Sequence, residues 1–283
     1  MTSRPKILIG TSGYYYNDWA ETVYPKELKK TDYLAYYSGI FSTVELNSTF
    51  YGMPTPEGMT KKLLEAGENT TFSVKATKTM THEIDHAQWR NEAETFIKAL
   101  YPLRQAKRLD AVLFQFPYSF HYSTGNRIYL DNLLKFFTEI PAAVEFRTSE
   151  WYATKVIQGM QKRGVSLVSL DMPNLPKLPP SMDVVTAPLA YIRLHGRNKE
   201  NWWASNDHAR YNYQYSDREL NAWADRIGRL SQKAERVLVY FNNHPNGQAV
   251  INARLLRVLL ANNGIIKRGG KEMENGEEGN MPS

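Results

Sequence analysis

The stretch Ala190-Tyr191-Ile192-Arg193-Leu194-His195-Gly196-Arg197 decides the fold class and points to the functional end of the molecule. Its first five residues alternate between apolar and polar positions, which is typical of a β-strand, and the chain then breaks at Gly196. Arg193 and His195 share one face, because side chains two apart on a strand point the same way. An unpaired buried arginine is costly, so we expect an acidic or anionic partner beside Arg193.

The size and composition of the chain are those of a soluble globular protein. Its 283 residues suffice for one α/β barrel or two smaller domains, and 42% are hydrophobic and 23% charged. The absence of cysteine excludes disulfides, Cys-ligated zinc, iron–sulfur clusters and thiol nucleophiles, and it is consistent with the cytoplasmic location that we expect. The start of the chain lacks the apolar run of a signal peptide, and no stretch approaches the ~20 apolar residues that span a bilayer.

The net charge of +6 favours anionic ligands such as phosphates, nucleic acids or acidic metabolites. A merely soluble surface explains the same charge equally well.

Strands and helices alternate along the chain. Strands are expected over 7–13, 41–51, 72–76, 111–117, 142–147, 165–171, 190–195 and 237–244. Helices are expected over 32–41, 55–66, 91–106, 127–140, 150–162, 216–234 and 249–260, with a capping box of Ser216 and Glu219. Such alternation predicts parallel strands with crossover helices.

Eight such units fit the roughly 250 residues of a closed barrel. We therefore predict an α/β fold, a single (β/α)8 TIM-like barrel over residues 1–266, followed by a disordered tail over 267–283 that is rich in glycine and charge. A doubly wound open sheet is the alternative, but the Gly-rich fingerprint that usually opens its first helix is missing.

Polar residues gather at the carboxyl ends of the expected strands, which in a barrel meet at one mouth. These residues are Glu45, Asn47, Lys75, Gln115, Glu145, Arg147, Asp171, Arg193, His195, Tyr240, Asn242 and His244. Each has a structural explanation, such as an ion pair between Glu145 and Arg147 or a hydrogen-bonded histidine. Their convergence on one end nevertheless favours a ligand site.

The residue types suggest acid–base chemistry on an anion. Three carboxylates, Glu45, Glu145 and Asp171, are the expected acids or bases, with His195 as a proton shuttle. Lys75, Arg147 and Arg193 would hold an anion or lower the pKa of a neighbouring carboxyl.

The three acids can balance the three bases, which leaves Arg197 as the surplus cation. We expect Arg193 or Arg197, together with the 242–244 segment, to bind phosphate after the seventh and eighth strands.

The loop over 196–215 contains Trp202, Trp203 and three tyrosines among basic residues. Its aromatic side chains either cover the barrel mouth or stack on sugars or bases, and Trp202 is the ligand-binding residue expected there.

His82-Glu83-Ile84-Asp85-His86 fits the H-E-x-x-H pattern of zinc proteases. That chemistry needs both histidines on one helical face and a third ligand, whereas this motif falls in a loop without one. A polar mouth loop that adds His82 or Glu83 to the site is the better interpretation. We assign no metal ligands and no cofactor.

Seven short blocks of the chain match, in order, the pattern of a known family. They are Ile9-Gly10-Thr11-Ser12-Gly13-Tyr14 with Trp19 and Tyr24-Pro25, Val44-Glu45-Leu46-Asn47-Ser48-Thr49-Phe50-Tyr51, Phe72-Ser73-Val74-Lys75-Ala76, Leu113-Phe114-Gln115-Phe116-Pro117, Val144-Glu145-Phe146-Arg147, Tyr191-Ile192-Arg193-Leu194-His195-Gly196-Arg197 and Tyr240-Phe241-Asn242-Asn243-His244. Over about residues 7–262 the chain thereby resembles the DUF72 (YecE-like) family. The resemblance implies a TIM barrel and brings no established reaction.

A relation of that family to barrels of the endonuclease IV type further implies a nucleic-acid or phosphate ligand. Those enzymes hold three zinc ions with many histidines, and His195 and His244 are too few for such a site.

Three functions follow as hypotheses. The first is an acid–base enzyme acting on a phosphorylated or sugar-containing small molecule, the second a nucleic-acid binder, and the third a metal-assisted hydrolase. The substrate and the oligomeric state stay open.

Overall fold

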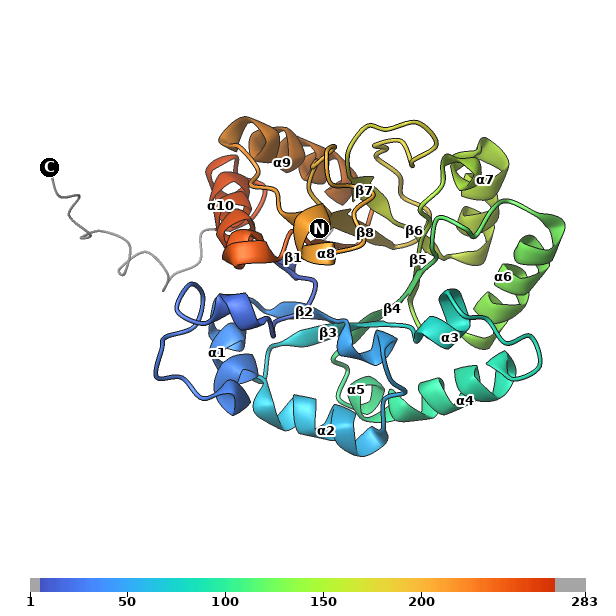
Figure 1. The fold of residues 1–283 in the computed structure, drawn as a ribbon, viewed down its shortest axis with the longest axis horizontal. Coiled ribbons are helices and arrows are strands. Elements are labelled where there is room, and N and C mark those ends of the chain that lie inside the picture. The colour runs from blue at the N-terminus through green and yellow to red at the C-terminus, as the bar shows by residue number, and fades with distance from the viewer. Residues whose placement is uncertain (1–5, 268–283) are drawn as a thin grey trace, which may run out of the picture.

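The computed structural model describes residues 6–267 as an α/β protein in which most helices lie around the outside of parallel strands (Figure 1). The strands are β1 Lys6–Thr11, β2 Thr43–Leu46, β3 Thr71–Lys75, β4 Leu109–Gln115, β5 Ala142–Glu145, β6 Ser166–Leu167, β7 Ser169–Asp171, β8 Leu189–Leu194 and β9 Arg236–Phe241. The helices are α1 Tyr33–Ile40, α2 Pro56–Glu65, α3 Lys78–Thr81, α4 Trp89–Ala99, α5 Tyr101–Gln105, α6 Thr124–Phe136, α7 Thr154–Arg163, α8 Asp207–Tyr211, α9 Asp217–Ser231 and α10 Gln248–Asn262.

The strands form two parallel sheets, in the orders β1-β9-β8-β7 and β2-β3-β4-β5-β6. The expected sixth strand is divided at Val168, so that β6 pairs with β5 and β7 pairs with β8. The two sheets also meet at a second seam, between the edge strands β1 and β2. There an isolated parallel bridge joins Ser12, the residue after β1, to Glu45 of β2. The expected α/β class with parallel strands is confirmed. The hydrogen-bonded strands form two separate sheets rather than one continuous sheet.

Two expected elements end earlier than the pattern suggested. The strand expected over 41–51 stops at Leu46 and continues as a short 3-10 helix, Ser48–Phe50, so Asn47 follows the strand and is not part of it. The helix expected over 91–106 is two helices, α4 and α5, because Pro102 lacks the N–H that an uninterrupted helix needs and instead occupies the first turn of α5.

The capping box at the start of α9 is confirmed, since the Ser216 amide donates to Glu219 Oε2 at 2.9 Å and the Glu219 amide donates to Ser216 Oγ. Gly196, two residues after the end of β8, has φ +88°, and a Cβ there would lie 2.6 Å from Cβ of Tyr213. Only glycine fits this turn, which sends the chain from the strand into the loop that ends at α9.

Strand interiors are apolar, as expected for parallel strands covered on both faces; Val112, Phe114 and Val144 have no exposed surface. None of the helices between residues 6 and 267 has the length and apolar character that crossing a lipid bilayer requires. The predicted disordered tail lies, except for Lys267, outside the described residues.

Candidate functional site

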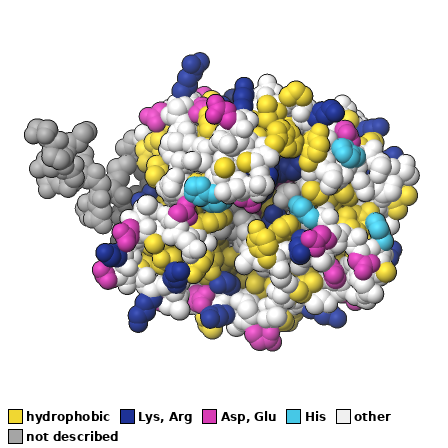
Figure 2. Space-filling view, viewed as in Figure 1, with side chains coloured by type: hydrophobic (Ala, Val, Ile, Leu, Met, Phe, Trp, Pro, Cys, Tyr) yellow, Lys and Arg dark blue, Asp and Glu magenta, His cyan; other side chains and the backbone are white. Residues whose placement is uncertain are grey.

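A cavity of about 450 Å³ opens where the carboxyl ends of the strands meet the loops that follow them. Seven of the predicted site residues line it: Asn47, Lys75, Gln115, Arg147, Arg193, Asn242 and His244. Figure 2 shows this face of the molecule hollowed near its centre. The cavity thus lies at the end of the strands where the sequence predicts a site, and seven of the fourteen predicted site residues line it.

Arg193 at the end of β8 joins two buried carboxylates. Its Nη1 donates to Glu145 Oε2 and its Nη2 donates to Glu45 Oε1, both at 2.7 Å, and Nη2 also lies 3.2 Å from Ser12 Oγ. Arg193 is 2% exposed and both glutamates are fully buried. The Tyr191 hydroxyl donates to the second oxygen of Glu45 at 2.7 Å. The acidic partner expected for Arg193 is thus confirmed, as a pair of carboxylates.

Glu145 is shared by a second cation and by a histidine. Arg147 Nε lies 2.6 Å, and His195 Nε2 3.2 Å, from Glu145 Oε1. Burial opposes ionisation, but the guanidinium groups of Arg193 and Arg147 hold the pKa of Glu145 well below its usual range. Glu145 is therefore ionised, and the positive charges of Arg193 and Arg147 neutralise it.

His195 is buried and neutral. Burial, with the nearby charge of Arg147, lowers its pKa to about 3. Its Nδ1 lies 3.1 Å from the amide nitrogen of Asn242, which can only donate, so the ring proton belongs on Nε2, facing Glu145. The ring lies behind the cavity wall rather than in it.

Lys75, the last residue of β3, takes no part in the ion pairs that Arg147 and Arg193 make with Glu145 and Glu45. Its Nζ lies 4.0 Å from the centroid of the Phe50 ring, and within residues 6–267 it has no hydrogen-bond acceptor and no carboxylate in ion-pair contact. Burial, followed by the charge of Arg193, lowers the pKa of Lys75 to about 7. The side chain is partly exposed, and the space it faces is the cavity.

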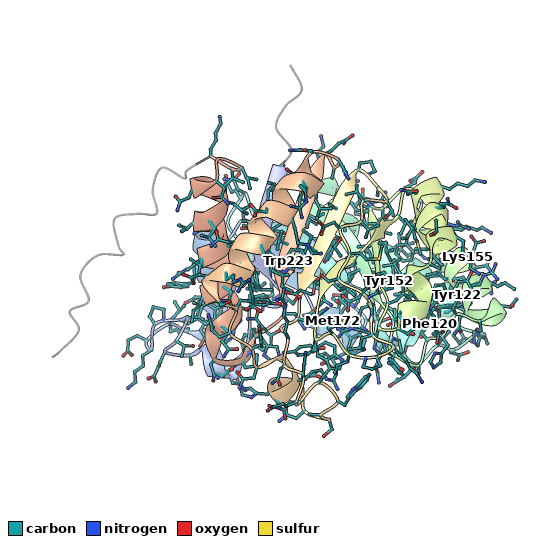
Figure 3. All side chains as sticks on the ribbon, turned by 90° about the horizontal axis from the view of Figure 1, so that it is seen from above. Phe120, Tyr122, Tyr152, Lys155, Met172 and Trp223 are labelled. Atoms are coloured by element: carbon teal, nitrogen blue, oxygen red, sulfur yellow. The ribbon has the colours of Figure 1, made fainter. Side chains whose placement is uncertain are left out.

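A separate cluster surrounds Asp171, at the end of β7. Arg197 Nε donates to Asp171 Oδ1 at 2.8 Å, Arg197 Nη1 donates to Glu219 Oε1 at 2.9 Å, and the Trp223 indole donates to Asp171 Oδ2 at 2.8 Å. Trp223 reaches it from α9 (Figure 3). The expectation that Arg197 is a surplus cation is wrong, because Glu219, predicted only as a helix cap, supplies a second carboxylate.

Two further predicted residues lie outside the cavity lining. Tyr240 is fully buried and its hydroxyl lies 2.7 Å from Thr43 Oγ1 and 3.0 Å from Ser73 Oγ, deeper between the strands. Trp202 is 3% exposed and packs beside His195 and Arg147. The sequence left two interpretations of the aromatic loop open, covering the mouth or stacking on a ligand. The buried position of Trp202 fits the first, a residue that covers the mouth.

Several cavity residues escaped the sequence analysis. Tyr16 stacks on His244, with ring centroids 4.3 Å apart and planes 5° apart, and Tyr51, Lys62 and Asp207 also line the cavity. The aromatic run that includes Tyr16 is visible in the sequence after the first strand. Lys62, by contrast, projects from the last turn of α2, where no strand-end argument places it.

The H-E-x-x-H segment follows α3 as a loop, as expected. The ring of His82 packs on Phe50 and that of His86 on Tyr129, so the two histidines face different neighbours. Among the residues that the structure describes, no three His, Asp or Glu side chains are grouped so as to hold a metal ion.

A second cavity of about 390 Å³ lies between α6 and α7. Two of its three cations lie over one ring, Lys155 Nζ at 4.7 Å and Arg127 Cζ at 5.3 Å from the centroid of Tyr122, and Figure 3 shows Lys155 beside Tyr122. It contains none of the predicted site residues.

Fold and site together define an α/β protein of parallel strands with a basic cavity at the strands' carboxyl ends. Residues 8–274 match the family model described as "Protein of unknown function DUF72", and the chain belongs to this family, as the resemblance of its seven blocks implied.

The similar proteins cover nearly the same length. The UPF0759 protein YunF of Bacillus subtilis (strain 168) is 29% identical in an alignment of 269 residues that covers 90% of this chain and 94% of that protein. The crystal structure of a DUF72 family protein from Thermotoga maritima has a TM-score of 0.82 and 34% identity, covering 90% of this chain and 99% of its own. A DUF72 family protein from Enterococcus faecalis has a TM-score of 0.79 and 28% identity, covering 90% and 95%.

Proposed function

We propose that this protein binds a small anionic ligand in the cavity, at the mouth of a single closed (β/α)8 barrel. The closed barrel is supported by both seams: β6 and β7 are consecutive pieces of one stretch shared by the two sheets, and the Ser12–Glu45 bridge joins the opposite edges. The strand order then runs once around a ring.

The observation that carries the anion site is the unpaired amine of Lys75 in the same cavity as two guanidinium groups. Glu45 and Glu145 offset Arg147 and Arg193, but neither glutamate lines the cavity. Within residues 6–267, the carboxylate that does line it is Asp207 of α8. An anion entering the cavity therefore meets cationic groups whose counter-charges are held behind them.

The other lining groups favour a phosphorylated or sugar-containing ligand. Asn47, Gln115 and Asn242 present amide groups, which are donors and acceptors for hydroxyls. Tyr51 is 74% exposed and Tyr15 47% exposed at the same cavity, where their faces can stack on a sugar ring.

For acid–base chemistry, the geometry favours Lys75 over the carboxylates predicted from the sequence. Glu45 and Glu145 are engaged by Arg193, and Asp171 is engaged by Arg197 away from the cavity. Lys75 combines contact with the cavity and a pKa of about 7, which suits proton transfer near neutral pH.

The test is sulfate affinity measured by calorimetry between pH 6 and pH 8, a range in which sulfate keeps its charge. Protonated Lys75 binds the anion and neutral Lys75 does not, so affinity should fall by about threefold to tenfold as pH rises through 7. Lys75→Met should weaken binding at pH 6 and remove this pH dependence.

The matched control is Lys78→Met, on α3 outside the cavity, where Lys78 Nζ pairs with Glu83. It should leave sulfate affinity unchanged. Absence of sulfate binding to the wild-type protein, or binding that Lys75→Met does not alter, would contradict the proposal. If single-stranded DNA instead bound tightly, with affinity falling steeply in salt, the nucleic-acid hypothesis would replace it.

A further inference from the structure

Two lysines line the cavity and differ in their surroundings. Lys62 Nζ donates to the Tyr14 hydroxyl at 2.6 Å and lies 3.4 Å from Glu65 Oε2. Lys75 Nζ has the Phe50 ring beneath it, and the charges of Arg193, Arg147, Glu45 and Glu145 act on it without a direct contact. One amine is thus held by acceptors, whereas the other has a free lone pair whenever it is deprotonated.

We propose that Lys75 is a nucleophile that forms an imine with a small carbonyl compound carrying an adjacent anionic group, the simplest being a 2-oxo carboxylate. This rests on the proposed anion site and names the substrate class that the site takes. The guanidinium groups would hold the carboxylate, and the amine, in the same cavity, would meet the neighbouring carbonyl carbon.

The physical basis is that no carboxylate among residues 6–267 makes an ion pair with Lys75. A lysine in contact with a carboxylate stays protonated and cannot attack, whereas burial next to other cations favours the neutral amine. The two lysines follow this rule. Burial and then Arg193 lower the pKa of Lys75 to about 7, against the opposing effect of the carboxylates of Glu45 and Glu145. Burial also acts to lower the pKa of Lys62, but the Tyr14 hydroxyl and Glu65 raise it above its usual value.

The step balances without a further reactant. The Lys75 lone pair forms the C–N bond as the carbonyl π electrons move to oxygen, and proton transfer from nitrogen to oxygen gives a carbinolamine. The C–O bond then breaks and the oxygen leaves as water with the two hydrogens of the original amine, which leaves a C=N bond. The nearby guanidinium groups stabilise the oxyanion that forms on the way.

The experiment traps the imine with added cyanoborohydride, which supplies the hydride that makes the link permanent. The wild-type protein is incubated with pyruvate, or separately with glyoxylate, and the modified residue is located by peptide mass spectrometry. Reduced adduct should accumulate at Lys75 at least tenfold faster than at any other lysine, and its rate should level off above about pH 7.

Lys75→Arg keeps the charge and removes the nucleophile, so the fast adduct should disappear. Lys78→Arg, on α3 outside the cavity, is the matched control and should label Lys75 as the wild type does. Labelling spread evenly over surface lysines, or fast labelling of Lys62, would overturn the proposal.

Sulfate separates this failure from that of the anion site. If sulfate binds through Lys75 but no imine is trapped, the nucleophile proposal is wrong and the anion site stands. If sulfate does not bind and no imine is trapped at Lys75, both proposals fail.

Discussion

Two ionic clusters lie at the carboxyl ends of the strands, and they differ in what they leave unpaired. In the cluster around Asp171, one arginine is held by two carboxylates, Asp171 and Glu219, and an indole donates to Asp171 as well. In the cluster around Glu145, Arg193 and Arg147 balance two carboxylates, and the neighbouring Lys75 has no acidic partner within the described chain.

This difference separates an anchoring cluster from a binding one. The Asp171 cluster ties the loop that follows β8 to the start of α9, since Glu219 is also the capping residue of that helix. The Glu145 cluster fixes Arg147 and Arg193 at the cavity wall with their counter-charges behind them. Charged residues at strand ends thus either anchor a loop or face the cavity, and the number of oppositely charged partners distinguishes the two roles.

The largest expected effect is that of Arg193→Met. This change leaves the buried carboxylate of Glu45 without its cation and removes one of the two that hold Glu145. An uncompensated buried charge costs about 3–5 kcal/mol, so the free energy of unfolding in urea should fall by that amount. A loss below about 1 kcal/mol would mean that the Glu145 cluster is no more tightly built than the other.

A smaller effect is expected on the pH dependence of stability, and it comes from two histidines at or behind the cavity wall. Burial lowers the pKa of His195 to about 3 and that of His244 to about 4, so between pH 6.5 and about 4 the unfolded chain binds more protons than the folded one. Stability should therefore fall as pH falls through this window, by up to about 1.4 kcal/mol per pH unit for each histidine.

His195→Gln should reduce that slope by about one proton, whatever it does to stability at neutral pH. The measurement is urea unfolding at half-unit steps of pH, and an unchanged slope would show that His195 titrates normally in the folded protein.

The smallest stability effect is expected for Arg197→Met. Asp171 is buried, but the Trp223 indole still donates to it and the Arg197 side chain is 35% exposed, so the loss should be smaller than that of Arg193→Met. Sulfate affinity should stay within twofold of wild type, because Arg197 does not line the cavity. A clear loss of sulfate binding would erase the distinction between the two clusters.

The sequence predicted the parallel α/β class and the end of the strands that carries the cavity, because alternation of elements and side-chain parity are local properties. It did not reveal that Arg197 is neutralised, since Glu219 comes from a helix twenty-two positions further along the chain and had a sufficient local explanation as a cap. It also placed Tyr240 at the mouth, because parity fixes the face of a strand but not the depth at which a side chain lies.

The central claim is that Lys75 is an unpaired amine facing the cavity, and its titration tests this most directly. In protein with isotopically labelled lysine side chains, with Lys75→Arg used to assign the signal, nuclear magnetic resonance should show a midpoint near pH 7 that moves upward when sulfate is added. A midpoint near that of an ordinary lysine, about 10.4, unmoved by sulfate, would contradict the account.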